Sequence, residues 1–282
     1  MNKLDFISRQ FSRAEKKRFE HYVVTRIWHL LNDLSIKFVT QQYVSRPDGR
    51  ALTDMFFPQL QIHIEIDEGH HKKQIEWDKL READIINATG HEVLRVDVTQ
   101  NIEAINTEIF KIVEHIKLKK SNSNDFKSWD IEAELNPKTY IDKGFIDLND
   151  DCAFRTMVDA ANCFGNDYKP KGIWTGGAGH GKDNGKIIWF PKLYKNGKWN
   201  NSISNDEIEI REICELPENA KSHIDHVLKD NRTRIVFARV KSPLGDIMYR
   251  FKGEYELDKN LTNYTDGLLW RRISKSVKTY SK

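Results

Sequence analysis

One stretch of the chain, Leu52–His71, limits most strongly what the N-terminal half can fold into. Its sequence is LTDMFFPQLQIHIEIDEGHH, in which apolar and polar residues alternate from Leu60 to Asp67. A period of two predicts a β-strand with one buried and one polar face. Residues 51–57 predict a second strand, and Pro58-Gln59 between them is short enough for a hairpin loop. The stretch therefore predicts two antiparallel strands of one sheet.

The polar side of this hairpin would gather acidic side chains. Paired residues point to the same side of a sheet, so a two-residue loop would place Asp54 on one face with His63, Glu65 and Asp67. A loop longer by one residue would break that parity. Carboxylates held close together repel one another unless a cation joins them, and their oxygens suit Mg²⁺ or Mn²⁺. A solvated polar strand face is the alternative, but the adjacent His70 and His71 favour a metal site.

Length and composition indicate a globular protein with two domains. The chain has 282 residues, of which 39% are hydrophobic and 31% charged. It has no run of about 18 apolar residues that would span a membrane. The N-terminus lacks the apolar segment of a signal peptide, and three widely spaced cysteines fit reduced thiols, so we expect a cytoplasmic protein. The net charge of +3 permits a nucleic-acid partner.

The N-terminal half alternates between helical and strand patterns. Ser12 and Glu15 form a capping-box pattern, and apolar spacing then predicts one helix from about residue 14 to 34. The later patterns predict a strand at 38–44, a helix at 74–89, a strand at 91–98 and a helix at 102–116. A strand, helix and strand in succession form a right-handed βαβ unit with parallel strands. Residues 1–118 are therefore expected to form a three-layer α/β domain.

The C-terminal half differs in character. Residues 119–130 are basic and then rich in Ser and Asn, which is typical of a solvated linker. Residues 131–282 contain short apolar runs separated by Gly, Asn and Pro, which predict a β-rich barrel or sandwich. His223 and His226 have a spacing found in metal sites, but no further ligands lie nearby in the sequence, so we expect no zinc there.

Three strings in the N-terminal half, IEIDEGHH, WDKLREADIINATG and HEVLRVDV, resemble the very-short-patch-repair-like endonucleases of the PD-(D/E)xK nuclease superfamily. Those relatives carry an Asp, then IEIDGxxH, then DxxR on a helix, then GxxVLR, in the order found here. KIIWFPKLYKNGKWNNSIS and MYRFKGEYELD resemble the second half of modification-dependent restriction endonucleases. That resemblance implies a nuclease domain joined to an SRA-like barrel, which recognises modified cytosine.

The resemblance implies roles for the acidic residues of the hairpin. Asp54 matches the aspartate of the PD motif, and Glu65 matches the first acid of the (D/E)xK pair, so both would coordinate Mg²⁺. Asp67 stands where the superfamily usually has lysine, and Thr53 stands where it has proline. The missing lysine leaves the identity of the general base open.

Histidines would take over the task of the missing lysine. The resemblance favours His71 first and His70 second as the group that positions or deprotonates the attacking water. Asp67 would be a third metal ligand or would orient a histidine. Glu20 matches a helix glutamate that such nucleases bring to the site, with an ordinary surface acid as the alternative.

In the C-terminal half, the resemblance assigns Trp199 and Asn201 to the modified-base pocket. A cytosine with a bulky polar group must leave the base stack to be inspected, and an aromatic ring can then stack on it. An acid should accept a hydrogen bond from the cytosine amino group. Glu209 is the first candidate for that acid, and Glu207 and Glu212 are alternatives.

Together these features predict a Mg²⁺-dependent endonuclease, with Mn²⁺ as a second possible ion. It would flip and recognise 5-hydroxymethylcytosine or its glucosylated form in double-stranded DNA, and cut some distance away as a homodimer. In a prokaryotic cytoplasm its target would be invading phage DNA. Two alternatives stay open: a catalytically inactive reader of modified DNA, and a nuclease triggered by damaged or branched DNA.

Overall fold

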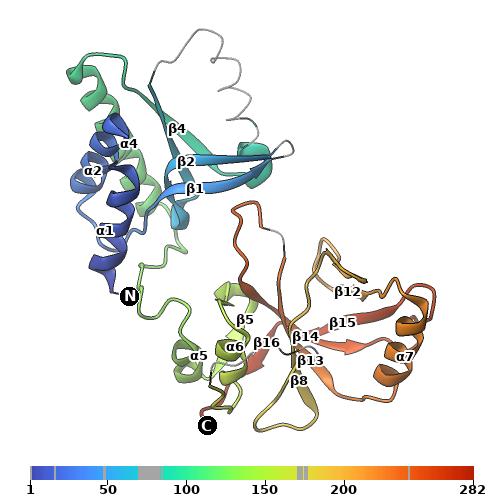
Figure 1. Cartoon of the computed structure of the whole chain (residues 1–282). Helices are drawn as coiled ribbons and strands as arrows, with labels where there is room; N and C mark the ends of the chain where they lie inside the picture. The colour runs from blue at the N-terminus through green and yellow to red at the C-terminus, as the bar shows by residue number, and fades with distance from the viewer. Residues whose placement is uncertain are drawn as a thin grey trace. The chain divides into compact units, whose positions relative to one another are not determined.

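The computed structural model describes residues 2–15, 17–46, 49–68, 83, 85–169, 174, 177–240 and 242–282. The chain divides into two compact units, which are Met1–Glu132 with Ser242–Gly245, and Ala133–Lys241 with Asp246–Lys282 (Figure 1). Within the described ranges, no helix combines the length and hydrophobicity that crossing a lipid bilayer requires.

The first unit is built on a four-stranded mixed sheet in the order β1-β2-β3-β4. Its elements are α1 (Lys3–Ala14), α2 (Arg18–Leu31), β1 (Val39–Arg46), β2 (Gly49–Phe57), the 3₁₀ turn η1 (Pro58–Leu60), β3 (Ile62–Asp67), β4 (Glu92–Asp97) and α4 (Ile102–Ser121). Neighbouring strands are antiparallel from β1 to β3, whereas β3 and β4 are parallel. The parallel pair confirms the predicted βαβ arrangement.

Apolar side chains of the sheet are buried on both of its faces. Ile62 and Ile64 of β3 are fully buried with Ile27 of α2, in a core to which α1 and α4 also contribute (Figure 1). On the other side, Val44 of β1 packs against Ile85, which belongs to the helical residues 85–89. Helices therefore cover both faces, as a three-layer α/β domain requires.

The hairpin between β2 and β3 has a different loop from the predicted one. A two-residue loop would pair Phe57 with Leu60, but Phe57 pairs with Ile62 instead. Residues 58–61 make the turn, with a 3₁₀ helix followed by a residue in the left-handed region. The loop is longer by an even number of residues, so the expected parity between Asp54 and β3 is kept.

The N-terminal helix prediction was wrong in its boundaries. The helix expected from residue 14 to 34 is shorter, Arg18–Leu31, because the chain is extended at Lys17 with φ −114° and ψ 105°. The helix α1 that precedes it was not predicted. Ser12, expected at a helix start, lies inside α1 and donates a hydrogen bond to the carbonyl of Ser8 at 3.0 Å. The break between the helices turns Lys17 toward the sheet, which matters for the site described below.

The second unit contains most of the shorter strands. Its elements are α5 (Pro137–Lys143), β5 (Phe145–Asp147), η2 (Leu148–Asp150), β6 (Ala153–Phe154), α6 (Met157–Asn162), β7 (Ala178–Gly179), β8 (Lys186–Trp189), β9 (Lys195–Asn196), β10 (Trp199–Asn200), β11 (Ser202–Ile203), β12 (Glu209–Glu212), α7 (Pro217–Leu228), β13 (Thr233–Ala238), β14 (Tyr249–Leu257), β15 (Leu268–Ser274) and β16 (Ser276–Lys278). The main sheet has the order β11-β12-β15-β14-β13-β8-β7, with β6 paired to β14. In the described residues this sheet is open, where a closed barrel was expected.

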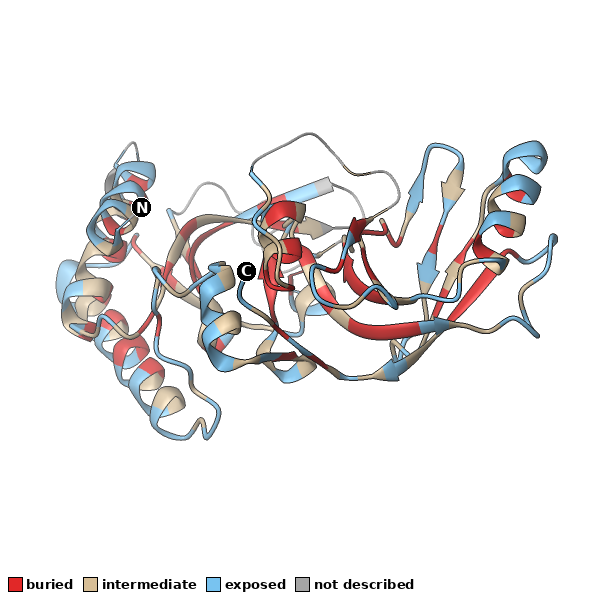
Figure 2. Cartoon of the chain, turned by 90° about the horizontal axis from the view of Figure 1, so that it is seen from below, coloured by how far each residue is buried: buried red, intermediate tan, exposed pale blue. Residues whose placement is uncertain are grey.

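The central strand β13 shows how the second unit builds its core. Ile235 and Phe237 belong to one hydrophobic cluster, and Val236 and Ala238 belong to another. Buried residues are coloured red in Figure 2 and occupy long stretches of the strands. The second cluster includes Ile224 of α7, a helix that the sequence patterns did not predict. A strand that is buried on both faces needs cover on both sides, and α7 supplies it for one of them.

Candidate functional site

Asp54 lies at the centre of an acidic cluster in the first unit. Its side chain leaves β2 next to β3, and its Oδ2 accepts a hydrogen bond from the backbone N–H of Ile66 at 2.8 Å. Asp54 is 7% exposed, and Glu65, which precedes Ile66 on β3, is 6% exposed. The structure thus places two nearly buried acids on adjoining strands, at the positions that the sequence indicated.

Gln41 of β1 joins two acids of this cluster. Its Nε2 donates to Glu20 Oε1 at 2.7 Å and to Asp54 Oδ1 at 3.3 Å. Its backbone has a φ of 53°, in the left-handed region that residues other than glycine seldom adopt. Strained backbone persists where the surrounding structure imposes it and is common at functional sites.

Glu20 points into the cluster and is only 1% exposed, so it is not the surface acid of the alternative interpretation. Lys17 Nζ lies 3.0 Å from Glu20 Oε2 and 3.4 Å from Asp54 Oδ1. Burial, followed by the negative charge of Asp54, raises the pKa of Glu20. Partial burial lowers the pKa of Lys17, but its contacts with Glu20 and Asp54 outweigh this and raise it overall. An ammonium group therefore balances the two acids.

Asp67, at the end of β3, has a separate partner. Its two carboxylate oxygens accept from Arg95 Nη1 at 3.0 and 3.1 Å, which links β3 to β4. Its predicted role beside the metal stays a prediction. The two candidate general bases, His70 and His71, lie outside the described residues.

His63 belongs to a buried aromatic stack. Its ring lies 4.1 Å from Phe56 and is nearly parallel to it, and its Nε2 lies 3.0 Å from His91 Nδ1. Its Nδ1 lies 2.9 Å from Thr53 Oγ1, so the threonine found in place of the family's proline has a structural partner. Burial and the neighbouring His91 lower the pKa of His63 to about 3. His63 is therefore neutral near pH 7.

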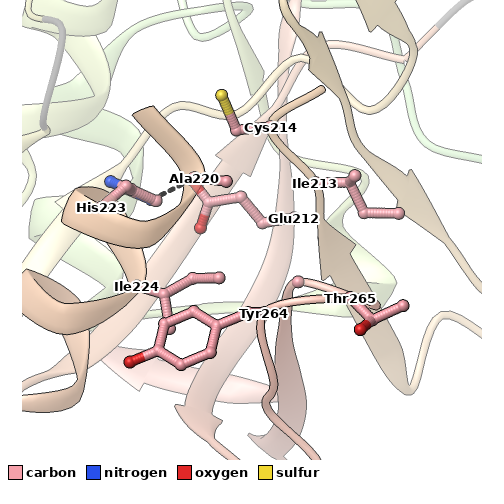
Figure 3. A pocket seen from close by; sticks show the side chains of 9 residues that line it. Glu212, Ile213, Cys214, Ala220, His223, Ile224, Tyr264 and Thr265 are labelled. Atoms are coloured by element: carbon pink, nitrogen blue, oxygen red, sulfur yellow. Dashed lines mark hydrogen bonds and ion pairs between the residues drawn. The ribbon is translucent and has the colours of Figure 1, made fainter. Parts of the chain in front are cut away.

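The second unit contains a small pocket between β12, α7 and the loop before β15 (Figure 3). Glu212 lies at its centre and is 8% exposed. The Oε1 of Glu212 lies 3.0 Å from His223 Nε2, and its Oε2 accepts from Trp270 Nε1 at 3.2 Å. Tyr264 and Thr265 form the opposite wall. The cavity measures about 20 Å³, which is room for about one water.

The predicted base-binding residues Trp199 and Asn201 do not line this pocket, but each contacts a residue that does. The Trp199 ring contacts His223 edge-on, with ring centroids 4.9 Å apart. Asn201 is 7% exposed, and its Oδ1 accepts from the backbone N–H of Ile213, a pocket residue, at 3.2 Å. Trp199 and Asn201 are thus each one contact away from the pocket around Glu212, Trp199 through His223 and Asn201 through Ile213.

The three candidate reading acids have different surroundings. On β12 the buried residues alternate, so Glu209 and Glu212 point to opposite faces. Glu209 pairs with Arg271 at 2.9 Å. Glu207 forms an ion pair with Lys252. Of the three, Glu212 lines the pocket, so the geometry favours the alternative candidate over Glu209.

Comparisons with known proteins match both units. Residues 4–117 match the family described as "Restriction endonuclease PvuRts1 I-like, N-terminal", and residues 139–279 match the "SET and RING associated domain". The solved structure of "The 5-Hydroxymethylcytosine-Specific Restriction Enzyme AbaSI" is 43% identical, covers 99% of this chain and 98% of that chain, and has a TM-score of 0.67. The chain belongs to the PvuRts1I-like restriction endonucleases. No curated protein matches it.

Membership of the PvuRts1I-like family confirms the resemblance found in the sequence. The first unit is the nuclease domain with its mixed sheet, and the second is the SRA-like domain. Restriction nucleases of this kind generally use a divalent metal ion. In the described part of the chain, no three His, Cys, Asp or Glu side chains form a metal cluster. The donor chemistry nevertheless fits, because Asp54, Glu65 and Glu20 offer hard carboxylate oxygens. Two of these acids, Glu20 and Asp54, already have a positive charge beside them, the ammonium group of Lys17.

Sequence analysis missed several residues of both sites in this PvuRts1I-like enzyme. Lys17 had only a weak signal, its spacing of three residues from Glu20. Gln41 had none, because a left-handed residue inside a strand leaves no trace in a hydrophobic pattern. His223 and Trp270 were not linked to Glu212 because they lie in different elements.

Proposed function

We propose that this enzyme is a Mg²⁺-dependent endonuclease, also able to use Mn²⁺, that flips and recognises 5-hydroxymethylcytosine or its glucosylated form in double-stranded DNA. It hydrolyses a phosphodiester at a distance from that base. The observation that carries the proposal is the carboxylate cluster around Asp54, in a chain that also holds a separate pocket around Glu212. The 5-hydroxymethylcytosine specificity in the name of AbaSI, 43% identical, supports the substrate.

In the nuclease domain, Asp54 and Glu65 would hold the ion. When bound, Mg²⁺ polarises a phosphate oxygen and lowers the pKa of a bound water. The bond from the Ile66 amide orients the Asp54 carboxylate, and the Gln41 amide orients Glu20 beside it. Both contacts hold the acids in place before substrate arrives, as precise catalysis requires.

The proton transfers need a base close to the attacking water. His71 is the first candidate and His70 the second, because both follow β3 directly in the sequence. His63 is unsuitable, since it is fully buried and contacts Thr53 and His91 through its two ring nitrogens. Asp67, which pairs with Arg95, would be a third metal ligand or would orient a histidine.

In the SRA-like domain, the flipped cytosine would stack on Trp199 and donate its amino group to Glu212. The pocket is too small for a pyrimidine as it stands, so a wall must move when the base enters. Tyr264 is the movable candidate. It is 57% exposed, and its hydroxyl bonds Asp225 of α7 at 2.5 Å, which joins the loop to the helix.

Cleavage of both strands would require a homodimer, because each chain has one nuclease site. Apolar side chains are exposed on neighbouring faces of α2 and α4, namely Phe19, Tyr22, Ile102 and Phe110, with exposures of 36% to 49%. Tyr22 bonds Asn106 across the two helices at 2.8 Å. Burial of this face against a second copy would remove apolar surface from water.

The domain limits and the setting belong to the same proposal. Residues 1–118 would act as the nuclease and residues 131–282 as the reader, with 119–130 between them. Trp129 in that intervening stretch is 7% exposed and packs in the first core, so the stretch is attached to the nuclease rather than fully solvated. In a prokaryotic cytoplasm the substrate would be invading phage DNA.

One experiment tests the proposed function most directly. Duplexes that are unmodified, 5-methylated, hydroxymethylated or glucosylated are incubated with the full-length protein, with Mg²⁺ and with EDTA. We expect cuts only with Mg²⁺ and only in the last two substrates. Binding of these substrates without cleavage would indicate an inactive reader. Cleavage of damaged or branched DNA in their place would indicate a different trigger.

A further inference from the structure

We propose that His223 is a positioning residue that, together with Trp270, holds Glu212 as an obligate hydrogen-bond acceptor. The pocket would therefore select 5-hydroxymethylcytosine over 5-hydroxymethyluracil, a base that carries the same hydroxymethyl group. This inference rests on the proposed function, since it assumes that a flipped base enters the pocket around Glu212.

Each oxygen of Glu212 has one nitrogen partner, and His223 donates to it in the tautomer that carries the proton on Nε2. The indole Nε1–H of Trp270 can only donate, and it lies 3.2 Å from Oε2. His223 Nε2 lies 3.0 Å from Oε1, the other oxygen of the carboxylate (Figure 3). Trp270 is 1% exposed, so the indole cannot turn away without opening the core. The carboxylate is thus fixed from two sides and keeps its remaining lone pairs for the pocket.

His223 itself is held in place. Its ring contacts Trp199 edge-on at a centroid distance of 4.9 Å, with the planes inclined at 74°. It extends from α7, whose Ile224 and Val227 are buried in the core. A movement of His223 would therefore disturb Glu212 and Trp199 together. This arrangement couples the group that would read the base edge to the ring that would stack on the base.

An acceptor fixed in this way distinguishes the two pyrimidines. Cytosine presents an amino donor at C4, whereas uracil presents a carbonyl acceptor at the same position. Two acceptors facing each other leave a buried polar group without a partner, and such mismatches are among the strongest sources of discrimination. The hydroxymethyl group does not help in this choice because both bases carry it. Glu212 and the residues that orient it must make the distinction.

The test uses the full-length protein in EDTA, so that binding is measured without cleavage. The probes are duplexes with one 5-hydroxymethylcytosine opposite guanine, or one 5-hydroxymethyluracil opposite adenine. A third probe with 5-hydroxymethyluracil opposite guanine controls for ease of flipping, because mispaired bases leave the stack more readily. The variants are His223→Ala, His223→Gln, which keeps a side-chain N–H donor, and His226→Ala, an exposed histidine on the same helix.

We expect the wild type to prefer 5-hydroxymethylcytosine over both uracil probes by about 10-fold or more. His223→Ala should lose most of that ratio, whereas His223→Gln and His226→Ala should keep it. If His223→Ala keeps the ratio of affinities, whether or not it weakens binding of all three probes equally, the inference is overturned. If His223→Ala unfolds, His223→Leu compared with His223→Gln at matched melting temperature decides the question in the same way. A wild type that does not bind the hydroxymethylcytosine probe would refute the proposed function instead.

Discussion

The backbone N–H of Ile66 donates a 2.8 Å hydrogen bond to the Asp54 carboxylate, and this bond ties the two strands of the hairpin at the acidic cluster. The contact orients one predicted metal ligand against the strand segment that carries the other. It also uses a backbone donor at the point where β2 and β3 stop pairing regularly, since the pairing runs from Phe57–Ile62 only to Met55–Ile64.

Asp54→Ala and Glu65→Ala should each lower cleavage of hydroxymethylated DNA by about 100-fold or more, because each removes a ligand of the ion that stabilises the reacting phosphate. Binding of the same DNA in EDTA should persist, since the reading pocket belongs to the other unit. Glu114→Ala, which removes an exposed acid of α4, serves as the control. A variant of Asp54 or Glu65 that still cuts at the wild-type rate would disprove the metal assignment.

Lys17→Met should lower the melting temperature of the metal-free protein, because Glu20 and Asp54 would then repel each other without a counter-charge. Added Ca²⁺ should restore the melting temperature, since a divalent ion replaces the lost ammonium. Lys117→Met removes a similarly spaced pair with Glu114 on the exposed face of α4. It should change neither the melting temperature nor the effect of Ca²⁺ on it. Loss of stability that Ca²⁺ does not reverse would argue against a cation site.

Glu20→Gln should stabilise the metal-free protein at neutral pH while weakening metal binding. Burial and Asp54 raise the pKa of Glu20 above its ordinary value, so the folded state holds this proton more tightly than the unfolded state. The stabilisation that protonated Glu20 provides is fully present below the pKa that Glu20 has in the unfolded protein. It is lost as the pH rises through the pKa that Glu20 has in the folded protein. Melting temperatures in EDTA across this range should fall less steeply for Glu20→Gln than for the wild type. If the melting temperatures of Glu20→Gln and the wild type fall equally steeply with pH, the prediction is wrong.

His63→Phe should make the protein less sensitive to acid. The pKa of His63 falls to about 3 in the folded protein, compared with 6.5 for the free side chain. Neutral His63 therefore contributes fully to the free energy of unfolding above pH 6.5. That contribution falls by about 1.4 kcal/mol per pH unit as the pH falls toward 3. Phenylalanine keeps the ring contact with Phe56 without the titrating group. Acid unfolding followed by circular dichroism checks this, with His226→Phe as the exposed control.

Glu212→Gln should weaken binding of hydroxymethylated DNA by about 10-fold. The amide has a single acceptor oxygen, so it can accept from the cytosine amino group but cannot also accept from both His223 and Trp270. Glu209→Gln should have a much smaller effect, since Glu209 lies on the other face of β12 with Arg271. Titration of each variant with a labelled hydroxymethylated duplex compares the two. A larger effect at Glu209 would assign the reading role to that residue.

Local patterns predicted the nuclease half well. The alternation in IHIEID identified β3, and the parity of the hairpin brought Asp54 to the same part of the sheet as Glu65. A strand's period of two depends only on backbone geometry, so these features follow from short stretches of sequence. The same patterns failed at the N-terminus, where α1 was not predicted and the start of α2 was placed several residues too early.

The pocket of the second unit was much harder to predict. Trp270 and Glu212 are separated by 58 residues, and His223 belongs to a helix that weak periodicity did not indicate. The sequence placed Glu209 first among three acids on or near β12, with Glu207 and Glu212 as alternatives. The buried face of that strand distinguishes Glu212 from Glu209.

The sequence by itself determined the family, the two-domain organisation and the candidate acids of the nuclease, because motifs and strand periodicity are written in contiguous residues. The tertiary structure alone decided which cation and amide approach those acids, and which glutamate faces the pocket. Those choices depend on contacts between side chains that are distant in the sequence, and each contact forms only when packing has fixed the backbone on both sides.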